Sequence, residues 1–271
     1  MEVSRVVDGA AEVCEDVVAV GERSVAVADG TSGFGDRSFT DGESDGRWYA
    51  ARLVRALVDE LDAGADLRPA CAAAISETGR ALAAAVPGDA DRSVRSAVAG
   101  HELPNAKVAA AAWDDDGALS YLVLGDTSAA FVDPSGRVST PGVLDHVDER
   151  TARIRSELKT RGADEAEVRE GQLSHIRATR SFCNVPGGYW VARLNPLAAE
   201  FATTGRRAPG DGPVLCYTDG FDPLVGRLGV FADPPAMVRF AADEGVAALR
   251  DRLRTVDDDS PDDASAVLVR A

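Results

Sequence analysis

The sequence predicts an α+β fold in which antiparallel sheets are covered by helices. Short apolar runs are separated by tight polar turns, as in residues 107–113 and 118–124 with the turn 114–117 between them. Hairpins of this kind favour antiparallel pairing of neighbouring strands. The helical segments come in runs between the strands instead of following every strand, which argues against a doubly wound parallel sheet.

Strands are expected where short apolar runs end at turn residues. They cover residues 17–20, 24–28, 107–113, 118–124, 128–132, 213–218 and 265–270. Short turns near 21–23, 114–117 and 133–136 join strands that follow one another in the chain. The acidic run from Asp114 to Asp116 is therefore interpreted as a solvated hairpin turn and not as a metal site.

Helical periodicity is clearest over residues 47–62. One face of this segment carries the apolar residues Ala50, Leu53, Val54, Leu57, Val58 and Leu61, at the spacing of an amphipathic helix. Further helices are expected over 69–85, 148–160, 196–204 and 234–254, the last with a break near Gly245. Pro196 and Gly205 frame the 196–204 helix, because proline favours a first helical position and glycine follows a last one.

Composition narrows the class of protein. The 271 residues carry a net charge of -16, and a surface this acidic repels nucleic-acid phosphates. No apolar run approaches the roughly 18 residues of a membrane helix, and the N-terminal residues lack an apolar signal segment. The four scattered cysteines show neither zinc spacing nor disulfide density. We therefore expect a cytoplasmic protein that binds neither nucleic acid nor membrane.

Carboxylates recur at the ends of the predicted strands, often beside glycine. A strand holds such a carboxylate rigidly, and the glycine lets a carbonyl oxygen or a ligand approach closely. Hard divalent cations prefer oxygen ligands of this kind. Together these positions predict a metal centre, and they are Glu15 with Asp16, Asp29 with Gly30, Asp126, Asp219 with Gly220, and Asp262 with Asp263.

The order of these motifs resembles that of the metal-dependent type 2C (PPM-type) Ser/Thr protein phosphatases, in their bacterial and archaeal form. The matching stretches are, in chain order, CEDVVAV, VAVADGTSG, LVLGDTSAAFV, VLCYTDGF and DDASAVLV. The similarity runs from Glu15 to Leu268, and it is loose over 137–212, where a substrate-access insert is possible in such a chain. The resemblance implies one domain over 1–271, built as a four-layer α-β-β-α sandwich of two antiparallel sheets flanked by helices.

The resemblance also implies a centre of two Mn²⁺ or Mg²⁺ ions, with room for a third. Asp29 corresponds to the ligand that bridges both ions, the Gly30 carbonyl to a ligand of the second ion, and Asp219 and Asp262 to ligands of the first. Asp126, with Asp219, matches a site for a third ion. Asp29, Asp219 and Asp262 form the implied catalytic set, and the full set of implied metal ligands is Glu15, Asp16, Asp29, Gly30, Asp126, Asp219 and Asp262.

Chemistry on two divalent ions needs no side-chain nucleophile. Such ions activate a water near neutral pH and neutralise the phosphoryl oxygens during in-line attack. Ser32 and Ser128 have no evident histidine partner, and His101, His146 and His175 are too scattered for a triad. His146 is slightly favoured among the three, because the family often has a similar Asp-His at that point.

The resemblance therefore implies a phosphatase whose partner is a protein phosphorylated on serine or threonine, and among oligomeric states the monomer is favoured. An alternative is a weak or inactive pseudophosphatase that binds phosphoproteins, since Ala10 and Ala11 lie where many family members carry a phosphate-binding arginine. Arg5 is the nearest substitute, and Thr31 stands where eukaryotic members have a proposed general-acid histidine. A third possibility is a hydrolase of a small phosphorylated metabolite or nucleotide.

Two interpretations of residues 180–196 remain open at this point. The Pro-Gly-Gly turn and the aromatic residues Tyr189 and Trp190 predict either a loop that shapes substrate access or a turn that leads into a buried aromatic strand.

Overall fold

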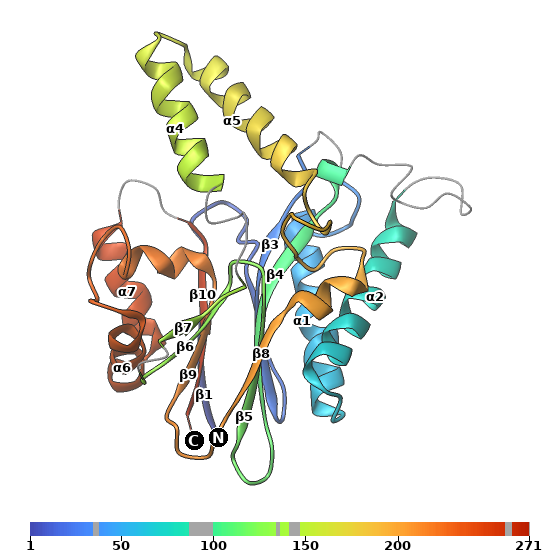
Figure 1. Ribbon diagram of the computed structural model, residues 1–271, viewed down its shortest axis with the longest axis vertical. Coiled ribbons are helices and arrows are strands. Elements are labelled where there is room, and N and C mark those ends of the chain that lie inside the picture. The colour runs from blue at the N-terminus through green and yellow to red at the C-terminus, as the bar shows by residue number, and fades with distance from the viewer. Residues whose placement is uncertain (35–37, 87–99, 134–135, 141–146, 258–261, 271) are drawn as a thin grey trace.

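A computed structural model describes the chain over residues 1–34, 38–86, 100–133, 136–140, 147–257 and 262–270. Within these ranges, two five-stranded antiparallel sheets stack face to face, with helices on both outer faces (Figure 1). The predicted α+β class and the four-layer α-β-β-α sandwich are confirmed.

Each sheet combines strands from distant parts of the chain. The first sheet has the order β1 (Glu2–Asp8), β10 (Ala264–Arg270), β9 (Val214–Tyr217), β6 (Ser128–Phe131) and β7 (Arg137–Val138). The second has the order β2 (Val17–Val20), β3 (Ser24–Thr31), β4 (Asn105–Trp113), β5 (Leu119–Leu124) and β8 (Thr203–Arg207). Because β1 pairs with β10, the two termini lie side by side at one end of the sandwich (Figure 1).

Strand alternation divides the core into layers. Along β3, Val25 and Val27 pack between the two sheets, whereas Ala26 and Ala28 pack under the helices on the outer face. Both sets are fully buried, so a strand covered on both faces carries apolar side chains at every position. β3 is therefore a central strand with a fixed register, and the residues at its end are held rigidly.

Helices cover the outer faces of the two sheets. α1 (Asp45–Asp62) and α2 (Leu67–Ala85) pack on the second sheet, and α6 (Pro234–Glu244) and α7 (Val246–Val256) pack on the first (Figure 1). The predicted apolar face of α1 is buried, with Leu53 and Leu57 fully inaccessible. The predicted break near Gly245 is confirmed, since this residue separates α6 from α7 with a φ of +94°.

A further pair of helices projects from one end of the sandwich. α4 (Val147–Thr160) and α5 (Glu165–Arg180) pack against each other and extend beyond the ends of the sheets (Figure 1). α5 begins with a capping box between Asp164 and Glu167.

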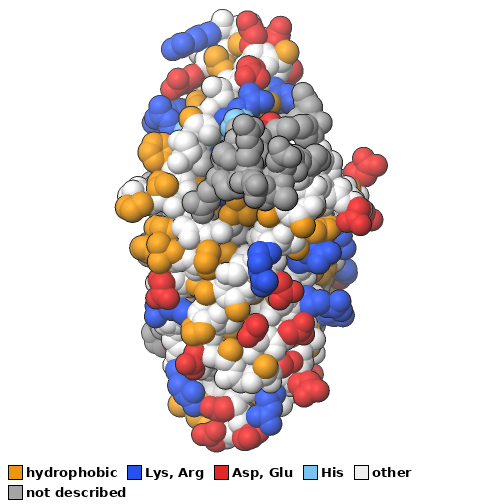
Figure 2. Space-filling model, turned by 90° about the vertical axis from the view of Figure 1, so that its right-hand side faces the viewer, with side chains coloured by type: hydrophobic (Ala, Val, Ile, Leu, Met, Phe, Trp, Pro, Cys, Tyr) orange, Lys and Arg blue, Asp and Glu red, His pale blue; other side chains and the backbone are white. Residues whose placement is uncertain are grey.

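No helix in the described part of the chain is both long and apolar enough to span a membrane. On the face formed by α1 and α2, acidic and basic side chains are interspersed (Figure 2).

Several elements differ from the sequence-based expectation, among them the two-residue strand β7, which the sequence analysis does not predict. The sequence does not predict β1, because it is an edge strand in which Val6 alone is buried. It does not predict α5 either, because few residues of this helix are apolar. The predicted 196–204 helix is wrong over its last three residues: a 3-10 helix covers Pro196–Phe201, and β8 begins at Thr203. Gly205 is a strand residue facing Tyr121, whose hydroxyl oxygen would lie 2.3 Å from an added Cβ.

The predicted 114–117 hairpin turn is confirmed. Asp114 accepts a hydrogen bond from the Ala118 N–H through its side chain, and its own N–H donates to the Ala118 carbonyl. Asp115 forms an ion pair with Arg23 on the neighbouring hairpin. The acidic side chains therefore stabilise an exposed turn between two paired strands, as the sequence predicts.

Candidate metal centre

A cavity of about 430 Å³ lies where β2 and β10 begin and β3 and β9 end. It is closed on one side by Ile176, Thr179 and Arg180 from the last turn of α5. Sheet pairing brings five separate stretches of the chain to this cavity. All of the predicted metal-binding residues line it, namely Glu15, Asp16, Asp29, Gly30, Asp126, Asp219 and Asp262.

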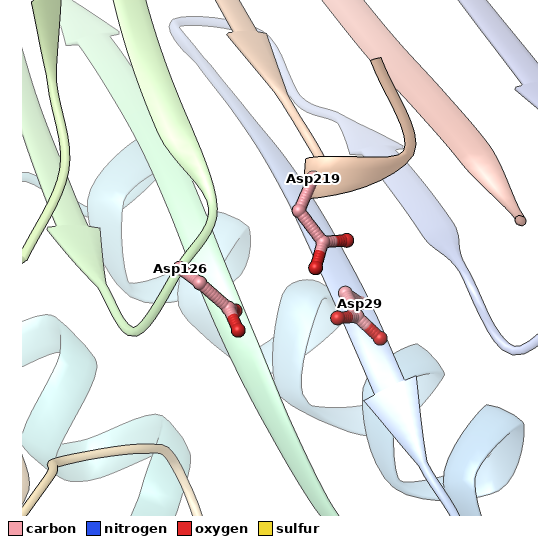
Figure 3. A group of neighbouring side chains, drawn as sticks. All are labelled: Asp29, Asp126 and Asp219. Atoms are coloured by element: carbon pink, nitrogen blue, oxygen red, sulfur yellow. The ribbon is translucent and has the colours of Figure 1, made fainter. Parts of the chain in front are cut away.

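Three carboxylates converge most closely. Asp29 comes from the end of β3 and Asp126 from the turn after β5 (Figure 3). Asp219 is the first residue of the 3-10 helix Asp219–Leu224, which follows β9. One carboxylate oxygen of each lies within 4.8 Å of the others. Oxygen atoms at this spacing from three separate elements form a donor set of the type that hard divalent cations prefer.

Burial and mutual repulsion raise the pKa values of four acids in the cavity, which are Asp16, Asp29, Asp219 and Asp262. Burial is the largest cause for Asp219, and the negative charges of Asp126 and Asp29 raise its pKa further. Burial and the charge of Asp29 raise the pKa of Asp16 to about 8, and the same causes raise that of Asp262. Carboxylates crowded in this way are stabilised in their charged form by cations, so the residues present fit Mn²⁺ or Mg²⁺.

The free energy of unfolding of the metal-free protein should therefore depend on pH. The pKa of Asp16 rises from an ordinary 3.8 to about 8 on folding, so its protonated form favours the folded state. The stabilisation present at low pH is lost as the pH rises toward that folded value. In EDTA, we expect the melting temperature to fall between about pH 5 and pH 8, and saturating Mn²⁺ to remove most of this decrease.

Differential scanning fluorimetry across that range, with and without Mn²⁺, measures the effect. The Asp16→Asn variant should show a flatter profile in EDTA, because it lacks the titrating group. A metal-free profile that is flat or rises in the wild type would contradict the expected like-charge repulsion.

Hydrogen bonds from neighbouring residues hold the two acids that precede β2. Ser32 donates to both carboxylate oxygens of Glu15, from its N–H at 2.9 Å and from its hydroxyl. The same hydroxyl accepts a hydrogen bond from Gly46 N–H at the start of α1, at 3.0 Å. Asp16 is 2 % exposed, and its Oδ2 accepts a hydrogen bond from the Thr218 hydroxyl at 2.7 Å. Both carboxylates are thereby fixed in orientation.

The two adjacent acids before β10, Asp262 and Asp263, form different hydrogen bonds. Asp263 accepts hydrogen bonds from the N–H groups of Ala10 and Glu15, both at 2.8 Å, and so ties the N-terminal loop to β10. The Asp262 carboxylate accepts one hydrogen bond from the described residues, from the Asp263 N–H at 2.8 Å, and its backbone carbonyl accepts one from Arg254 Nη2 at 2.7 Å. The geometry therefore gives Asp263 a loop-anchoring function and leaves Asp262 as the acid of this pair with the more available carboxylate.

Two cations in the cavity were not predicted from the sequence. Lys107 on β4 contacts Asp29, with its Nζ 2.5 Å from Asp29 Oδ2. Arg180 at the end of α5 donates from Nη1 to the carbonyl oxygens of His101 and Leu103, and its guanidinium lies 4.3 Å from the centre of the Phe34 ring. Lys107 had one local signal, because it is a lone charged residue inside an apolar strand. Arg180 had none.

Other residues considered from the sequence lie elsewhere. Arg5 is a β1 residue paired with Val267 and does not line the cavity, so it does not replace the missing arginine. His101 and His175 also lie outside the cavity lining. His146 lies outside the described residues. These positions give no support to a histidine-dependent nucleophile in the described part of the site.

The 180–196 segment follows the second of its two interpretations, with one addition. Tyr189 and Trp190 are buried, and Ala192 forms a β-bridge with Ala106 at the start of β4. The segment is therefore a turn leading into a buried aromatic stretch. Tyr189 nevertheless lines the cavity, so one member of the aromatic pair contributes to the shape of the site.

Solved structures with the same arrangement of sheets and helices identify the class of fold to which this sandwich belongs. The chain matches the catalytic domain of the Ser/Thr protein phosphatase PstP in complex with two manganese ions, with a TM-score of 0.58 and 16% identity over 98% of this chain and 96% of that one. It also matches the PPM Ser-Thr phosphatase MsPP from Mycobacterium smegmatis in complex with cacodylate, with a TM-score of 0.53 and 15% identity over 100% and 98%.

A third match extends to another bacterium. PppA, described as a key regulatory component of T6SS in Pseudomonas aeruginosa, aligns with a TM-score of 0.53 and 15% identity over 100% of this chain and 97% of that one. No protein-family model matches the sequence, and no curated protein matches it in a sequence search. The chain therefore has the PPM-type Ser/Thr phosphatase fold, and the predicted resemblance is confirmed at the level of the fold.

Proposed function

We propose that this chain is a metal-dependent phosphatase of the bacterial PPM type, which hydrolyses phosphoserine and phosphothreonine in proteins. The observation that carries the proposal is the convergence of the seven predicted ligand residues, from five separate stretches of sequence, on one cavity. The shared fold with PstP and MsPP supports it. Any one Asp-Gly pair is commonly a turn, but five strand-end stretches meeting at one cavity are what a metal centre requires.

In this proposal, Asp29, the Gly30 carbonyl, Asp219 and Asp262 hold two Mn²⁺ or Mg²⁺ ions. When bound, the ions supply an activated water nucleophile and neutralise charge on the phosphoryl group. Ser32 orients Glu15 and leaves a lone pair on each carboxylate oxygen for a hydrogen bond from bound water. The expected third ion, at Asp126 with Asp219, stays a prediction.

Arg180 supplies the positive charge for the substrate phosphate in this proposal. Among the described residues lining the cavity, it and Lys107 are the cationic side chains, and Lys107 is already bound to Asp29. The hydrogen bonds that the described residues show for Arg180 come from Nη1. A guanidinium anchored through one nitrogen keeps others for a phosphate oxygen.

Arg180→Lys should therefore raise the KM for a phosphopeptide roughly tenfold, because a charged hydrogen bond is lost. The value of kcat should change much less, since the substitution leaves the carboxylates intact. Arg177→Lys is the matched control on the same helix, where the side chain is paired with Glu170 on the surface. Equal KM values for wild type and Arg180→Lys would show that Arg180 does not contact the phosphate.

The proposed activity is tested by hydrolysis of p-nitrophenyl phosphate and of phosphothreonine and phosphoserine peptides, with EDTA, Mg²⁺ or Mn²⁺. Metal-dependent turnover of the peptides would support a protein phosphatase. Turnover confined to small phosphoesters would favour the metabolite hydrolase instead. If the protein neither bound a divalent ion nor hydrolysed any phosphoester, the proposal would be abandoned.

A pseudophosphatase is the second candidate, and two observations favour it. The Lys107 ammonium already neutralises Asp29, the acid expected to bridge the two ions, and no arginine replaces Ala10 or Ala11 at the cavity from the N-terminal side. Such a protein would bind a phosphopeptide without turnover. Calorimetric binding of the peptide, combined with undetectable hydrolysis in Mn²⁺, would select this candidate.

We further propose that the protein acts as a monomer in the cytoplasm on a phosphorylated protein, with neither nucleic acid nor membrane as a partner. All four cysteines are free thiols, which is usual in a reducing compartment. The strongly acidic charge of -16 supports the expectation that nucleic acid is not a ligand.

A further inference from the structure

Lys107 occupies a specific position among the carboxylates. In the antiparallel register of β3 and β4 it lies directly opposite Asp29. Its Nζ is 2.5 Å from Asp29 Oδ2, 3.2 Å from Thr31 Oγ1 and 3.9 Å from Asp126 Oδ1. The side chain is 14% exposed. The ammonium is therefore enclosed by two carboxylates and a hydroxyl, and it is not a surface lysine whose ion pair is solvated.

The backbone holds the lysine stem in this position. Gly125, in the turn that carries Asp126, has a φ of +92°, and a Cβ added there would lie 2.5 Å from Lys107 Cγ. The turn therefore packs its bare backbone against the aliphatic stem of the lysine. This close packing restricts the rotamers open to Lys107, so the ammonium stays between Asp29 and Asp126.

The ammonium and a divalent ion would compete for the same oxygens. Asp29, Asp126 and Asp219 bring three carboxylate oxygens within 4.8 Å of one another, and Lys107 Nζ is bonded to one of these acids and close to a second. A second cation bound to Asp29 and Asp126 would lie beside the ammonium in a largely buried site, where like charges repel strongly. Asp16 and Asp262 line the same cavity, and the ammonium of Lys107 forms its ion pairs with Asp29 and Asp126 and not with these two acids.

We propose that Lys107 is a built-in cation that takes the position of one divalent ion between Asp29 and Asp126. Divalent ions then bind to Asp16, Asp219, Asp262 and the Asp29 oxygen that does not contact the ammonium, and Asp126 is the partner of Lys107 instead of a metal ligand. This inference rests on the metal binding in the proposed function. It goes beyond that function because it assigns one cation position to the chain itself.

The test counts Mn²⁺ ions bound per chain, by equilibrium dialysis with metal analysis and by titration calorimetry. Lys107→Met removes the charge and keeps the length of the stem, and it should bind one more Mn²⁺ per chain than the wild type. Lys159→Met is the matched control. Lys159 pairs with Glu165 on the surface, and its loss should leave the number unchanged. In the Lys107→Met background, Asp126→Asn should abolish the additional ion.

A second measurement does not depend on whether the lysine variant folds. Asp126→Asn in the wild-type background should bind as many Mn²⁺ ions as the wild type, because Asp126 is paired with the lysine. Loss of an ion in this variant would overturn the inference, as would identical Mn²⁺ binding by Lys107→Met and the wild type.

The same counts separate this inference from the proposed function. An additional ion in Lys107→Met, with a wild type that binds none, would support the built-in cation and argue against the metal-dependent enzyme. Normal binding and hydrolysis by the wild type, with no gain in Lys107→Met, would overturn the built-in cation alone. Absence of Mn²⁺ binding in both proteins would overturn both ideas.

Discussion

Replacing Asp219 with asparagine is expected to lower metal-dependent hydrolysis of p-nitrophenyl phosphate by about 100-fold or more. Asparagine keeps the shape of the side chain but offers one neutral oxygen where the carboxylate offered two charged ones. Asp219 is one of the three acids whose oxygens converge within 4.8 Å, so in the proposed centre its charge would contribute directly to holding a cation. The measurement is kcat/KM in saturating Mn²⁺, together with the Mn²⁺ affinity.

The same substitution should stabilise the protein when metal is removed. Burial and the charges of Asp126 and Asp29 raise the pKa of Asp219, and a neutral amide avoids that repulsion. We therefore expect Asp219→Asn to melt at a higher temperature than the wild type in EDTA while it loses activity in Mn²⁺. A variant that merely unfolds would lose both.

Asp243→Asn provides the control for Asp219→Asn. Asp243 is exposed on α6, outside the cavity lining, and its substitution should change neither activity nor melting temperature. Retention of full metal-dependent activity by Asp219→Asn would contradict the proposed centre.

Gly30→Ala is expected to lower the free energy of unfolding by about 1–3 kcal/mol and to disturb the site at the same time. A Cβ at this position would lie 2.5 Å from the Gly46 carbonyl oxygen and 2.6 Å from that of Glu15. Both contacts are backbone atoms, so neither moves without displacing the start of α1 or the loop before β2. The glycine next to Asp29 is therefore required by close packing of three backbone segments.

Gly79→Ala is the matched control for Gly30→Ala. Gly79 lies inside α2, and an added Cβ would come no closer than 3.6 Å to Leu194. Alanine should stabilise this helix by about 0.5–1 kcal/mol, because it loses less backbone entropy on folding. Urea unfolding in EDTA compares the two variants. Equal stability of Gly30→Ala and the wild type would mean that α1 and the loop can shift freely.

The amino-acid sequence predicts the elements whose pattern is local. Alternating and helical periodicity located β3, β4, β5 and α1, and the polar residues at 114–117 located a hairpin turn. It also determined which acids stand at strand ends, because a strand ends where its apolar run meets aspartate and glycine. All of these acids line the cavity.

Tertiary structure alone decided which cations enter the site and which elements surround it. Lys107 lies opposite Asp29 because β3 pairs with β4. Arg180 lies at the end of α5, a helix with few apolar residues. Arg5, the nearest arginine in the sequence, lies on β1 away from the cavity. Periodicity reports the local face that a residue occupies, whereas a cavity is formed by contacts between distant segments. The identity of its charged neighbours is therefore fixed only when the sheets assemble.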